Sequence, residues 1–311
     1  MPSWSTLEVS IPQLRIFLAV AERGNFTRAA EELFMAQPSV SAAIGKLEQT
    51  VGLQLFDQIG KRIHLTEAGE TLLLYAKRIL ALVDEAEGAL GEFQEAGSGR
   101  LLMGASNTIG IYVLPRVLRS FRALYPEPSV AIEIGNTSQV VSGVQCNRLD
   151  FGLVAGHPEH PDLKIRHFLT DRLVLIVPAD HLRAKEQSLT IADLAREPFI
   201  IRERGATTRA VVEQELSRLG IQLNVTMEVG DNEAVKQAVA AGLGVSILSE
   251  FTIATELALG RIAQLQVEGA HFQRDFYLLW HKDKYRTKTV RQFLDYLTTV
   301  VADPPYVSAK E

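Results

Sequence analysis

The stretch that decides the fold of the N-terminal part, residues 25–47, reads NFTRAAEELFMAQPSVSAAIGKL. Apolar residues recur at helical spacing in its first half and again after Pro38, which predicts two short helices joined by a tight turn. Pro38 suits the first turn of the second helix, because its missing N–H would have no intrahelical partner there. The second helix then directs outward Gln37, Ser39, Ser41, Ala42 and Lys46.

Short hydrogen-bonding side chains near a helix N-terminus suit base edges in the DNA major groove, and the N-terminus itself suits phosphate. An ordinary pair of packed helices with a solvated face would show the same pattern. The next segment favours DNA, since residues 56–66 hold two β-prone runs around Gly60-Lys61-Arg62, a hairpin signal. A basic hairpin after such a helix pair is a wing, in which Lys61 and Arg62 would contact phosphate or the minor groove.

Together with this predicted wing, the sequence resembles the LysR-type transcriptional regulators of bacteria over essentially its whole length. The matching segments are Leu14 to Phe17, Asn25 to Ala30, Gln37 to Ser41, Leu47-Glu48, Gly52 to Phe56 and Leu65 to Gly69. The resemblance implies binding to double-stranded promoter DNA as a homodimer or homotetramer, with RNA polymerase as a further candidate partner. The residues expected at the DNA are Thr27, Arg28, Gln37, Pro38, Ser39, Ser41, Lys46, Lys61 and Arg62.

Within that family the chain looks most similar to the branch with sulfite-responsive regulators of sulfur assimilation. This finer resemblance rests on Ser106 to Gly110 with Leu114-Pro115, on Gly135 to Thr137, on Arg202 to Arg209 and on Gly242 to Ser246. It implies a sulfite-like effector, while phosphorylated or carboxylated metabolites, including ones like ribulose bisphosphate, stay open as alternatives.

The N-terminal domain departs from the family pattern at several positions. Ala36 stands where the family usually has a serine or threonine cap, so about 1 kcal/mol of capping is absent or supplied elsewhere. Ala42 and Ala43 replace a common arginine and glutamine, and Gln58 replaces a common wing arginine. Fewer charged contacts imply a weaker hold on phosphate per subunit, with more of the affinity from multivalency and DNA shape.

Bulk properties describe a soluble globular protein of two or three domains: 311 residues, 47% hydrophobic and 22% charged. The chain lacks an apolar run of membrane-spanning length and a basic-then-apolar leader, so we expect a cytoplasmic protein without a membrane span. Its one cysteine, Cys146, falls in an expected helix and allows no internal disulfide. The net charge of −5 argues against a protein whose whole surface is coated by nucleic acid. Residues 1–65 have six basic and six acidic side chains. A DNA-binding module must therefore concentrate its cations on one face.

Residues 67–92 predict one long helix without proline. Its apolar stripe has no obvious partner in the same chain, which favours pairing with the same helix of a second subunit as a coiled coil. Packing onto the C-terminal domain is the alternative. Pairing would present two recognition helices to half-sites about 34 Å apart. The stripe consists of Leu72, Leu73, Ala76, Ile79, Leu80, Val83, Ala86 and Leu90.

From Arg100 onward strands and helices alternate, which predicts an α/β domain, with helices expected at residues 109–125 and 139–147 among others. The family resemblance implies that the last strand and helix, near residues 275–280 and 287–300, return to the first of two lobes, like a periplasmic solute-binding protein. The expected order is a winged helix-turn-helix domain (1–66), a dimerising linker helix (67–93), a hinge (94–100), an effector domain (101–303) and a tail (304–311). Within the effector domain we expect lobe I at about 101–169 and 270–303, and lobe II at about 170–269.

Four expected strand-to-helix junctions carry the same chemistry, at residues 106–108, 136–138, 205–208 and 230–232. Each places hydroxyl or amide side chains beside free backbone N–H groups, where open α/β sheets bind ligands. Good helix caps alone would look the same at any one junction. All four together, with Arg202 and Arg209 beside the third, favour a cleft for a small anion. The predicted effector residues are Ser106, Asn107, Thr108, Asn136, Thr137, Arg202, Gly205, Ala206, Thr207, Thr208 and Asn232.

Enzyme, metal and cofactor sites are not predicted. Ser106 lacks the second glycine of a nucleophile elbow, so it is expected to anchor a ligand. His157 and His160 are separated by prolines rather than placed one helical turn apart, which disfavours zinc. We therefore expect an effector-responsive transcription factor without catalytic residues or cofactor. The rival interpretation is a solute-binding or enzymatic α/β protein with an N-terminal association domain.

Overall fold

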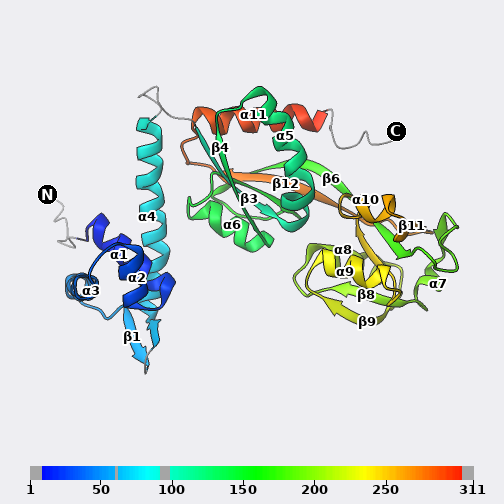
Figure 1. Cartoon of the computed structure of the whole chain (residues 1–311), viewed down its shortest axis with the longest axis horizontal. Helices are drawn as coiled ribbons and strands as arrows, with labels where there is room; N and C mark the ends of the chain where they lie inside the picture. Colours follow the sequence, from blue (N-terminus) through cyan, green and yellow to red (C-terminus); the bar gives the residue numbers. More distant parts are fainter. Residues whose placement is uncertain (1–8, 60–61, 92–98, 303–311) are drawn as a thin grey trace. The chain divides into compact units, whose positions relative to one another are not determined.

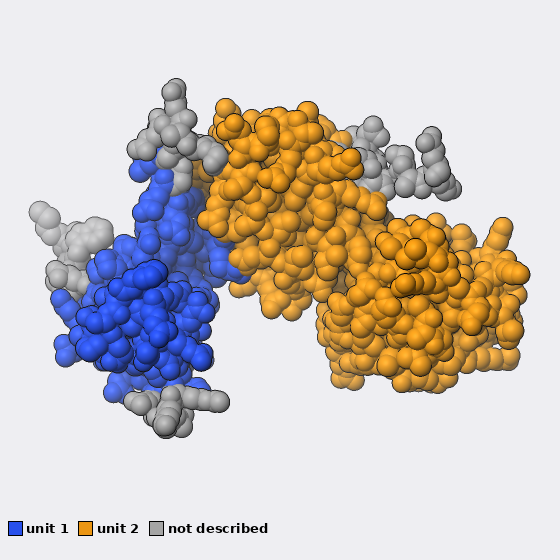
Figure 2. Space-filling model, viewed as in Figure 1, with its two compact units in different colours: residues 1–97, 146–148 blue, residues 98–145, 149–311 orange. Residues whose placement is uncertain are grey.

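The computed structural model describes residues 9–59, 62–91 and 99–302 (Figure 1). The chain divides into two compact units, residues 1–97 with 146–148 and residues 98–145 with 149–311 (Figure 2). The wing residue Lys61, the expected tail and all but the last two residues of the expected hinge lie outside the described residues. Within the described part of the chain, the helices are all too short or too polar to cross a membrane.

The first unit is a winged helix-turn-helix followed by a long helix, which confirms the predicted fold class of the N-terminal part. Its core gathers Phe17, Val20, Val40 and Leu47, each fully buried, from the first and third helices. Asn25 starts the second helix, because its side chain accepts hydrogen bonds from two backbone N–H groups of the first turn. The elements are α1 (Ile11–Arg23), α2 (Phe26–Glu32), α3 (Gln37–Val51), β1 (Phe56–Ile59), β2 (Arg62–Leu65) and α4 (Glu67–Gly91).

Side chains at the base of the wing fix it to the helices. Glu48 of α3 accepts hydrogen bonds from the backbone N–H groups of Leu55 (2.8 Å) and Phe56 (3.3 Å). Thr66 caps α4 by accepting from the N–H of Gly69 at 3.0 Å. Gly69 itself permits no side chain, since a Cβ there would lie 2.1 Å from the carbonyl oxygen of Leu55. The wing strands are thereby anchored at the start of α4.

The apolar stripe of α4 has two parts, which corrects the expectation that it lacks a partner in its own chain. Ala76 and Leu80 are buried against the core of the first unit, and Leu72 and Leu73 pack at its edge. A second group of large apolar side chains on α4 is at least 39% exposed: Leu74, Tyr75, Ile79, Leu82 and Leu90.

The second unit is an α/β domain with two lobes joined at a waist (Figure 2). Parallel strands β3, β4 and β5 form much of the first lobe, with a core of buried apolar residues from 101–169 and 276–297. The expected helix 109–125 begins as a π-helical turn, Ile109–Val113, and the expected helix 139–147 starts and ends two residues earlier, so Cys146 follows it. The elements are β3 (Arg100–Ser106), α5 (Leu114–Leu124), β4 (Ser129–Gly135), α6 (Thr137–Gln145) and β5 (Phe151–Ala155).

The second lobe has its own cores, built from residues 173–272. Its strands β8 and β9 pair in parallel, and the last residue of β8, Arg202, leads towards the N-terminus of α8. The elements are β7 (Ser188–Leu189), α7 (Ile191–Leu194), β8 (Pro198–Arg202), α8 (Thr207–Arg218), β9 (Asn224–Val229), α9 (Asn232–Ala240), β10 (Ser246–Ser249), α10 (Glu250–Ala258) and β11 (Ile262–Val267).

Two long strands connect the lobes. β6 (Leu163–Pro178) pairs with β12 (Gln273–His281) in the first lobe and with β10 and β11 in the second. β12 also pairs with β5, and α11 (Lys288–Ala302) packs on the same core as α5 (Figure 1). The chain therefore returns to the first lobe at its end, as the family resemblance implied.

Candidate functional site

The start of α3 presents a polar, solvent-exposed face. Val40, Ile44 and Leu47 point into the core, so the residues between them face outward. Helix α3 begins at an alanine, Ala36, and no side chain caps its first N–H groups. The structure leaves exposed every described member of the predicted DNA-binding set on α2 and α3: Thr27, Arg28, Gln37, Pro38, Ser39, Ser41 and Lys46. For Arg62 the structure describes the backbone, at the start of β2, and not the side chain.

Ion pairs separate the cations of the first unit into two groups. Arg15, Arg23 and Lys77 pair with Asp84, Glu32 and Glu22 at 3.5, 2.6 and 3.1 Å. Arg28 and Lys46, by contrast, have no ion-pair partner among the described residues. Residues 1–65, with six basic and six acidic side chains, thus keep Arg28 and Lys46 available near α3.

The predicted effector residues converge on one cavity between the lobes of the second unit. It measures about 220 Å³, and we call it the inner cavity. Its wall combines the ends of β3, β4 and β8 with the start of α8. From the predicted set it is lined by Ser106, Asn107, Thr108, Asn136, Thr137, Arg202, Gly205, Ala206, Thr207 and Thr208. Asn232 lies behind this wall and hydrogen-bonds to two lining residues.

The four junctions differ in how their helices are capped. Asn136 accepts from the N–H of Gln139 at 2.9 Å, and Asp231 accepts from the first turn of α9, so both act as ordinary caps. Helix α8 instead begins at Ala206, and no side chain caps it. Its first N–H groups therefore lie at the cavity wall without a side-chain acceptor. A helix N-terminus in this state favours an external anion.

Ser106 adds a buried polar group without a partner. Its side chain is 8% exposed and lines the inner cavity. Among the described residues, no group lies within hydrogen-bonding distance of its Oγ. Buried hydroxyls are nearly always hydrogen-bonded, which makes this one a candidate anchor for a ligand.

Arg202 is held by two side chains. Its Nη1 donates to Asn232 Oδ1, while Nε and Nη2 donate to the two carboxylate oxygens of Glu203 at 2.7 and 2.8 Å. The sequence prediction included Arg202 and Asn232 but missed Glu203, which also lines the cavity. An acidic residue between two arginines is an ordinary surface pattern, so its position gave no signal.

The sequence prediction also missed a buried ion pair where the lobes join. Arg274 and Asp171 lie opposite each other on β12 and β6, and Arg274 Nε donates to Asp171 at 2.8 Å. The other nitrogens of Arg274 donate to Thr108 (3.1 Å) and Thr208 (2.9 Å), so one guanidinium connects both lobes. Burial raises the pKa of the Asp171 carboxyl, and the charge of Arg274 opposes that shift. The signal in the sequence was a pair of adjacent charged residues inside each of two β-prone segments, Asp171-Arg172 and Arg274-Asp275.

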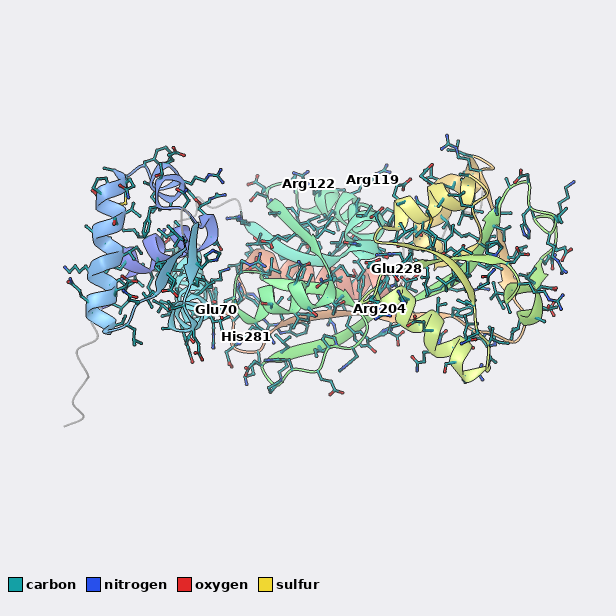
Figure 3. The ribbon with its side chains drawn as sticks, turned by 90° about the horizontal axis from the view of Figure 1, so that it is seen from below. Glu70, Arg119, Arg122, Arg204, Glu228 and His281 are labelled. Carbon is teal, nitrogen blue, oxygen red and sulfur yellow. The ribbon has the colours of Figure 1, made fainter. Side chains whose placement is uncertain are left out.

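A larger and more open cavity of about 510 Å³ adjoins the inner one, and we call it the outer cavity. The two share Thr137 and the Arg204–Thr207 loop in their walls. Arg204 lies near Glu228 where the lobes meet (Figure 3), and its charge helps to lower the pKa of that carboxyl, after the larger effect of the hydrogen bond from Arg209. Arg209 donates to both Glu213 and Glu228.

Pairing with carboxylates largely neutralises the arginines of the cleft. Arg202, Arg209 and Arg274 each have a carboxylate within 2.8 Å. Carboxylates thus pair with Arg202 and Arg209, the two arginines on which the sequence prediction of a small-anion cleft partly rested. The groups that can bind an anion there are the neutral donors, the uncapped N-terminus of α8 and the guanidinium hydrogens that are not already engaged.

Both parts of the chain match one protein family. Residues 11–70 match the bacterial regulatory helix-turn-helix proteins of the lysR family, and residues 94–302 match the LysR substrate binding domain. The chain is 40% identical to the HTH-type transcriptional activator CmpR of Synechocystis sp. over 93% of this chain and 94% of that protein. It is 34% identical to the RuBisCO operon transcriptional regulator of Allochromatium vinosum, covering 95% and 98% of the two chains.

Two solved structures have the same architecture. CbnR in complex with its target DNA matches with a TM-score of 0.72 at 24% identity, covering 94% of this chain and 99% of that one. The regulatory domain of CcmR from Synechocystis PCC6803, solved in complex with 2-PG, matches with a TM-score of 0.61 at 34% identity, covering 66% of this chain and 99% of that domain.

These relatives correct the finer resemblance proposed from the sequence. The chain groups with CmpR and regulators of RuBisCO operons, and the expected kinship with sulfite-responsive regulators is wrong. Three of the motifs behind that expectation, at residues 106–110, 135–137 and 202–209, include most of the cleft residues, which describe a shared fold more than a shared effector. The chain belongs to the LysR family, as a transcriptional regulator that joins a helix-turn-helix DNA-binding domain to an effector-binding domain.

Proposed function

We propose that this regulator binds a small metabolite carrying a phosphate and a carboxylate in its inner cavity, and that binding changes its affinity for promoter DNA. One observation carries the proposal: the unpartnered Ser106 Oγ and the uncapped N-terminus of α8 line the same cavity. An oxyanion would supply acceptors to both at once, and helix N-termini are common phosphate sites.

The relatives support this class of ligand. The CcmR regulatory domain, 34% identical to the matching part of this chain, was solved in complex with 2-PG. A cavity of about 220 Å³ suits an anion of a few heavy atoms, and the adjoining outer cavity leaves room for a second charged end. 2-Phosphoglycolate, which has a phosphate at one end and a carboxylate at the other, is therefore the first probe to use.

The DNA side of the proposal rests on α3. Its start would enter the major groove, with Gln37, Ser39 and Ser41 near base edges and the uncapped N-terminus near phosphate. Arg28 and Lys46 would contact the flanking phosphates, because neither is held in an ion pair among the described residues. The wing residues Lys61 and Arg62 are proposed to contact the backbone or the minor groove.

Helix α4 is proposed to pair two chains. Tyr75, Ile79 and Leu82 follow one another at helical spacing and are 57%, 39% and 51% exposed, so they form an apolar row without a partner in the described part of the first unit. Burying such a row against its copy would stabilise a dimer, and effector domains would extend it to a tetramer. Replacing Tyr75 and Leu82 together by glutamate should shift the sedimentation coefficient towards that of a smaller assembly.

Effector binding would be coupled to DNA binding through the contacts that connect the two lobes. Thr108 and Thr208 belong to different lobes and both accept from Arg274. A ligand beside them would therefore favour one relative position of the lobes, and through the assembled effector domains one spacing of the DNA-binding units. Such coupling is typically about 1–3 kcal/mol. RNA polymerase stays a candidate partner for the activated complex.

Calorimetric titration of 2-phosphoglycolate into the full chain tests the proposal. We expect binding by the wild type and a loss of about tenfold or more in Thr207→Ala, which removes a hydroxyl from the cavity wall. Thr226→Ala, on the exposed strand β9 and outside both cavity walls, is the matched control and should bind like the wild type. Equal affinity in all three proteins, or no binding by the wild type at millimolar ligand, would contradict the cleft assignment.

A further inference from the structure

The inner cavity contains an acidic side chain at the position that an anionic ligand would need. Glu203 lines that cavity and directs both carboxylate oxygens at Arg202, 2.7 Å from Nε and 2.8 Å from Nη2. A bidentate contact of this kind is the geometry in which arginine binds carboxylate or phosphate most strongly. The structure therefore shows Arg202 engaged by an anion that belongs to the protein itself.

The two groups that hold Arg202 differ in how firmly they are fixed. Asn232 is 4% exposed and is placed by contacts to both Arg202 and Thr108. The Glu203 side chain is 37% exposed, and its side-chain hydrogen bonds among the described residues all come from Arg202, whose own side chain is only 6% exposed. Rotation of Glu203 towards solvent would leave Arg202 in place, with two donors directed at the cavity.

We propose that Glu203 is an internal competitor for the effector and makes the cavity selective for a phosphoryl group over a carboxylate. This inference rests on the proposed function, since it concerns the same cavity. A ligand carboxylate that replaces Glu203 exchanges one carboxylate for another and gains little. A phosphoryl dianion brings more charge and additional oxygens, which reach Ser106 Oγ and the N–H groups of α8 while Arg202 is engaged.

The charge count of the cleft points the same way. Arg202 with Glu203 and Arg274 with Asp171 are both neutral pairs, which leaves Arg204 as the one cation of the inner wall outside an ion pair among the described residues. Removing Glu203 leaves one buried positive charge without a counter-ion, and an anion of any kind then gains a charge-assisted pair. A loss of the preference for phosphate over carboxylate therefore tests the proposal more specifically than a change in the affinity for one ligand.

The test is a calorimetric titration of the full chain with two ligands. One is 2-phosphoglycolate, and the other is diglycolate, in which a carboxymethyl group replaces the phosphoryl group. Glu203→Gln should bind both more tightly than the wild type, by about tenfold for diglycolate and less for 2-phosphoglycolate, so that the preference for phosphate falls. Glu186→Gln removes the same charge from a carboxylate that pairs with Arg183, outside both cavity walls, and should change either affinity less than about twofold.

Several outcomes would overturn the inference. Unchanged or weaker binding of both ligands by Glu203→Gln would show that Glu203 only stabilises Arg202. Equal tightening by Glu186→Gln would show a general effect of charge. If neither the wild type nor Glu203→Gln binds either ligand, the proposed function and the inference both fail. If the wild type binds 2-phosphoglycolate but the selectivity of Glu203→Gln is unaltered, the inference alone fails.

A second variant covers the case in which Glu203→Gln does not fold. Glu203→Asp keeps the charge but is one methylene shorter, so it cannot keep both contacts to Arg202. It should bind diglycolate more tightly than the wild type, and 2-phosphoglycolate should raise its Tm by more than it raises that of the wild type. Ligand-induced Tm shifts no larger than those of the wild type, with no gain for diglycolate, would overturn the proposal.

Discussion

Helices α3 and α8 begin differently from most other helices of this protein. Helices α2, α9 and α10 start at Asn25, Asp231 and Ser249, whose side chains accept hydrogen bonds from the first turn. Helices α3 and α8 start at Ala36 and Ala206, and no side chain caps either one. Both helices lie on the surfaces proposed to bind DNA and effector, whereas α5, which also has no side-chain cap, continues directly from the π-helical turn Ile109–Val113. The first N–H groups of a helix can donate either to a capping side chain or to an external anion. The residue at the cap position decides which of the two is possible.

The largest expected effect is at the start of α3. Ser39→Trp places a bulky side chain on the face proposed to enter the major groove, and should lower specific DNA affinity by about 100-fold or more, the cost of excluding the helix from the groove. Fluorescence anisotropy with the DNA upstream of the chain's own gene measures this. Gln49→Trp, exposed on the same helix but about two turns further along than Ser41, is the control.

Retained operator affinity in Ser39→Trp, with calorimetric ligand binding also intact, would mean that α3 is not the recognition helix. Ser41→Trp should behave like Ser39→Trp, because both side chains are exposed in the first turns of α3.

The second effect concerns α8. Ala206→Asp supplies both a capping oxygen and a negative charge at the uncapped N-terminus, so it should stabilise the fold but lower affinity for 2-phosphoglycolate about tenfold or more. Calorimetry and thermal unfolding on the same protein separate the two changes. A variant that gains stability while binding the ligand as tightly as the wild type would show that these N–H groups do not contact it.

How far the sequence predicted this site depends on the range of the interactions. The sequence predicted where β3, β4 and β8 end, because turns and helix starts depend on the residues beside them in the chain. The pairing of Arg274 with Asp171 spans 103 positions, and only the register of β12 on β6 brings the two together. The same holds for β6, whose 16 residues serve both lobes, and for Glu228, which pairs with Arg209 from 19 positions away. Glu203 and Glu213 are near their arginines in the sequence, but the sequence pattern does not tell whether these side chains pair. The sequence shows these charges without showing their partners.

A smaller effect is expected from capping α3. Ala36→Ser supplies the cap that the family usually has and should raise the free energy of unfolding of the first unit by about 1 kcal/mol. Chemical denaturation of the full chain, followed by a probe in that unit, measures the change. Ala36→Gly is the comparison, since it adds no side-chain acceptor. No gain from serine relative to glycine would mean that another group already satisfies those N–H donors.

The smallest expected effect is on stability, and it concerns the C-terminal end of α8 rather than its N-terminal end. Near its C-terminal end, Glu215 accepts from Arg218 and from the N–H of His271, and these hydrogen bonds lower the pKa of Glu215 to about 2. A lowered carboxyl pKa stabilises the fold above the unfolded value near 4.5, and that contribution is lost as the pH falls towards 2. Glu215→Gln should therefore be less stable than the wild type at neutral pH, by about 1 kcal/mol or less after screening, and the difference should narrow as the pH falls from about 5 towards 2.

Denaturant titrations of Glu215→Gln and the wild type across this pH range give the difference directly. A gap that stays constant or widens on acidification would mean that Glu215 is not ionised through these contacts.

The central claim is that an anion in the inner cavity alters DNA binding by the other unit. The most direct measurement is operator affinity by anisotropy, with and without saturating 2-phosphoglycolate, for the wild type and for Thr207→Ala. We predict a change of about fivefold or more in the wild type, in the range usual for allosteric coupling, and a much smaller one in the variant at the same ligand concentration. Operator affinity that does not respond to the ligand, or responds equally in both proteins, would contradict the account.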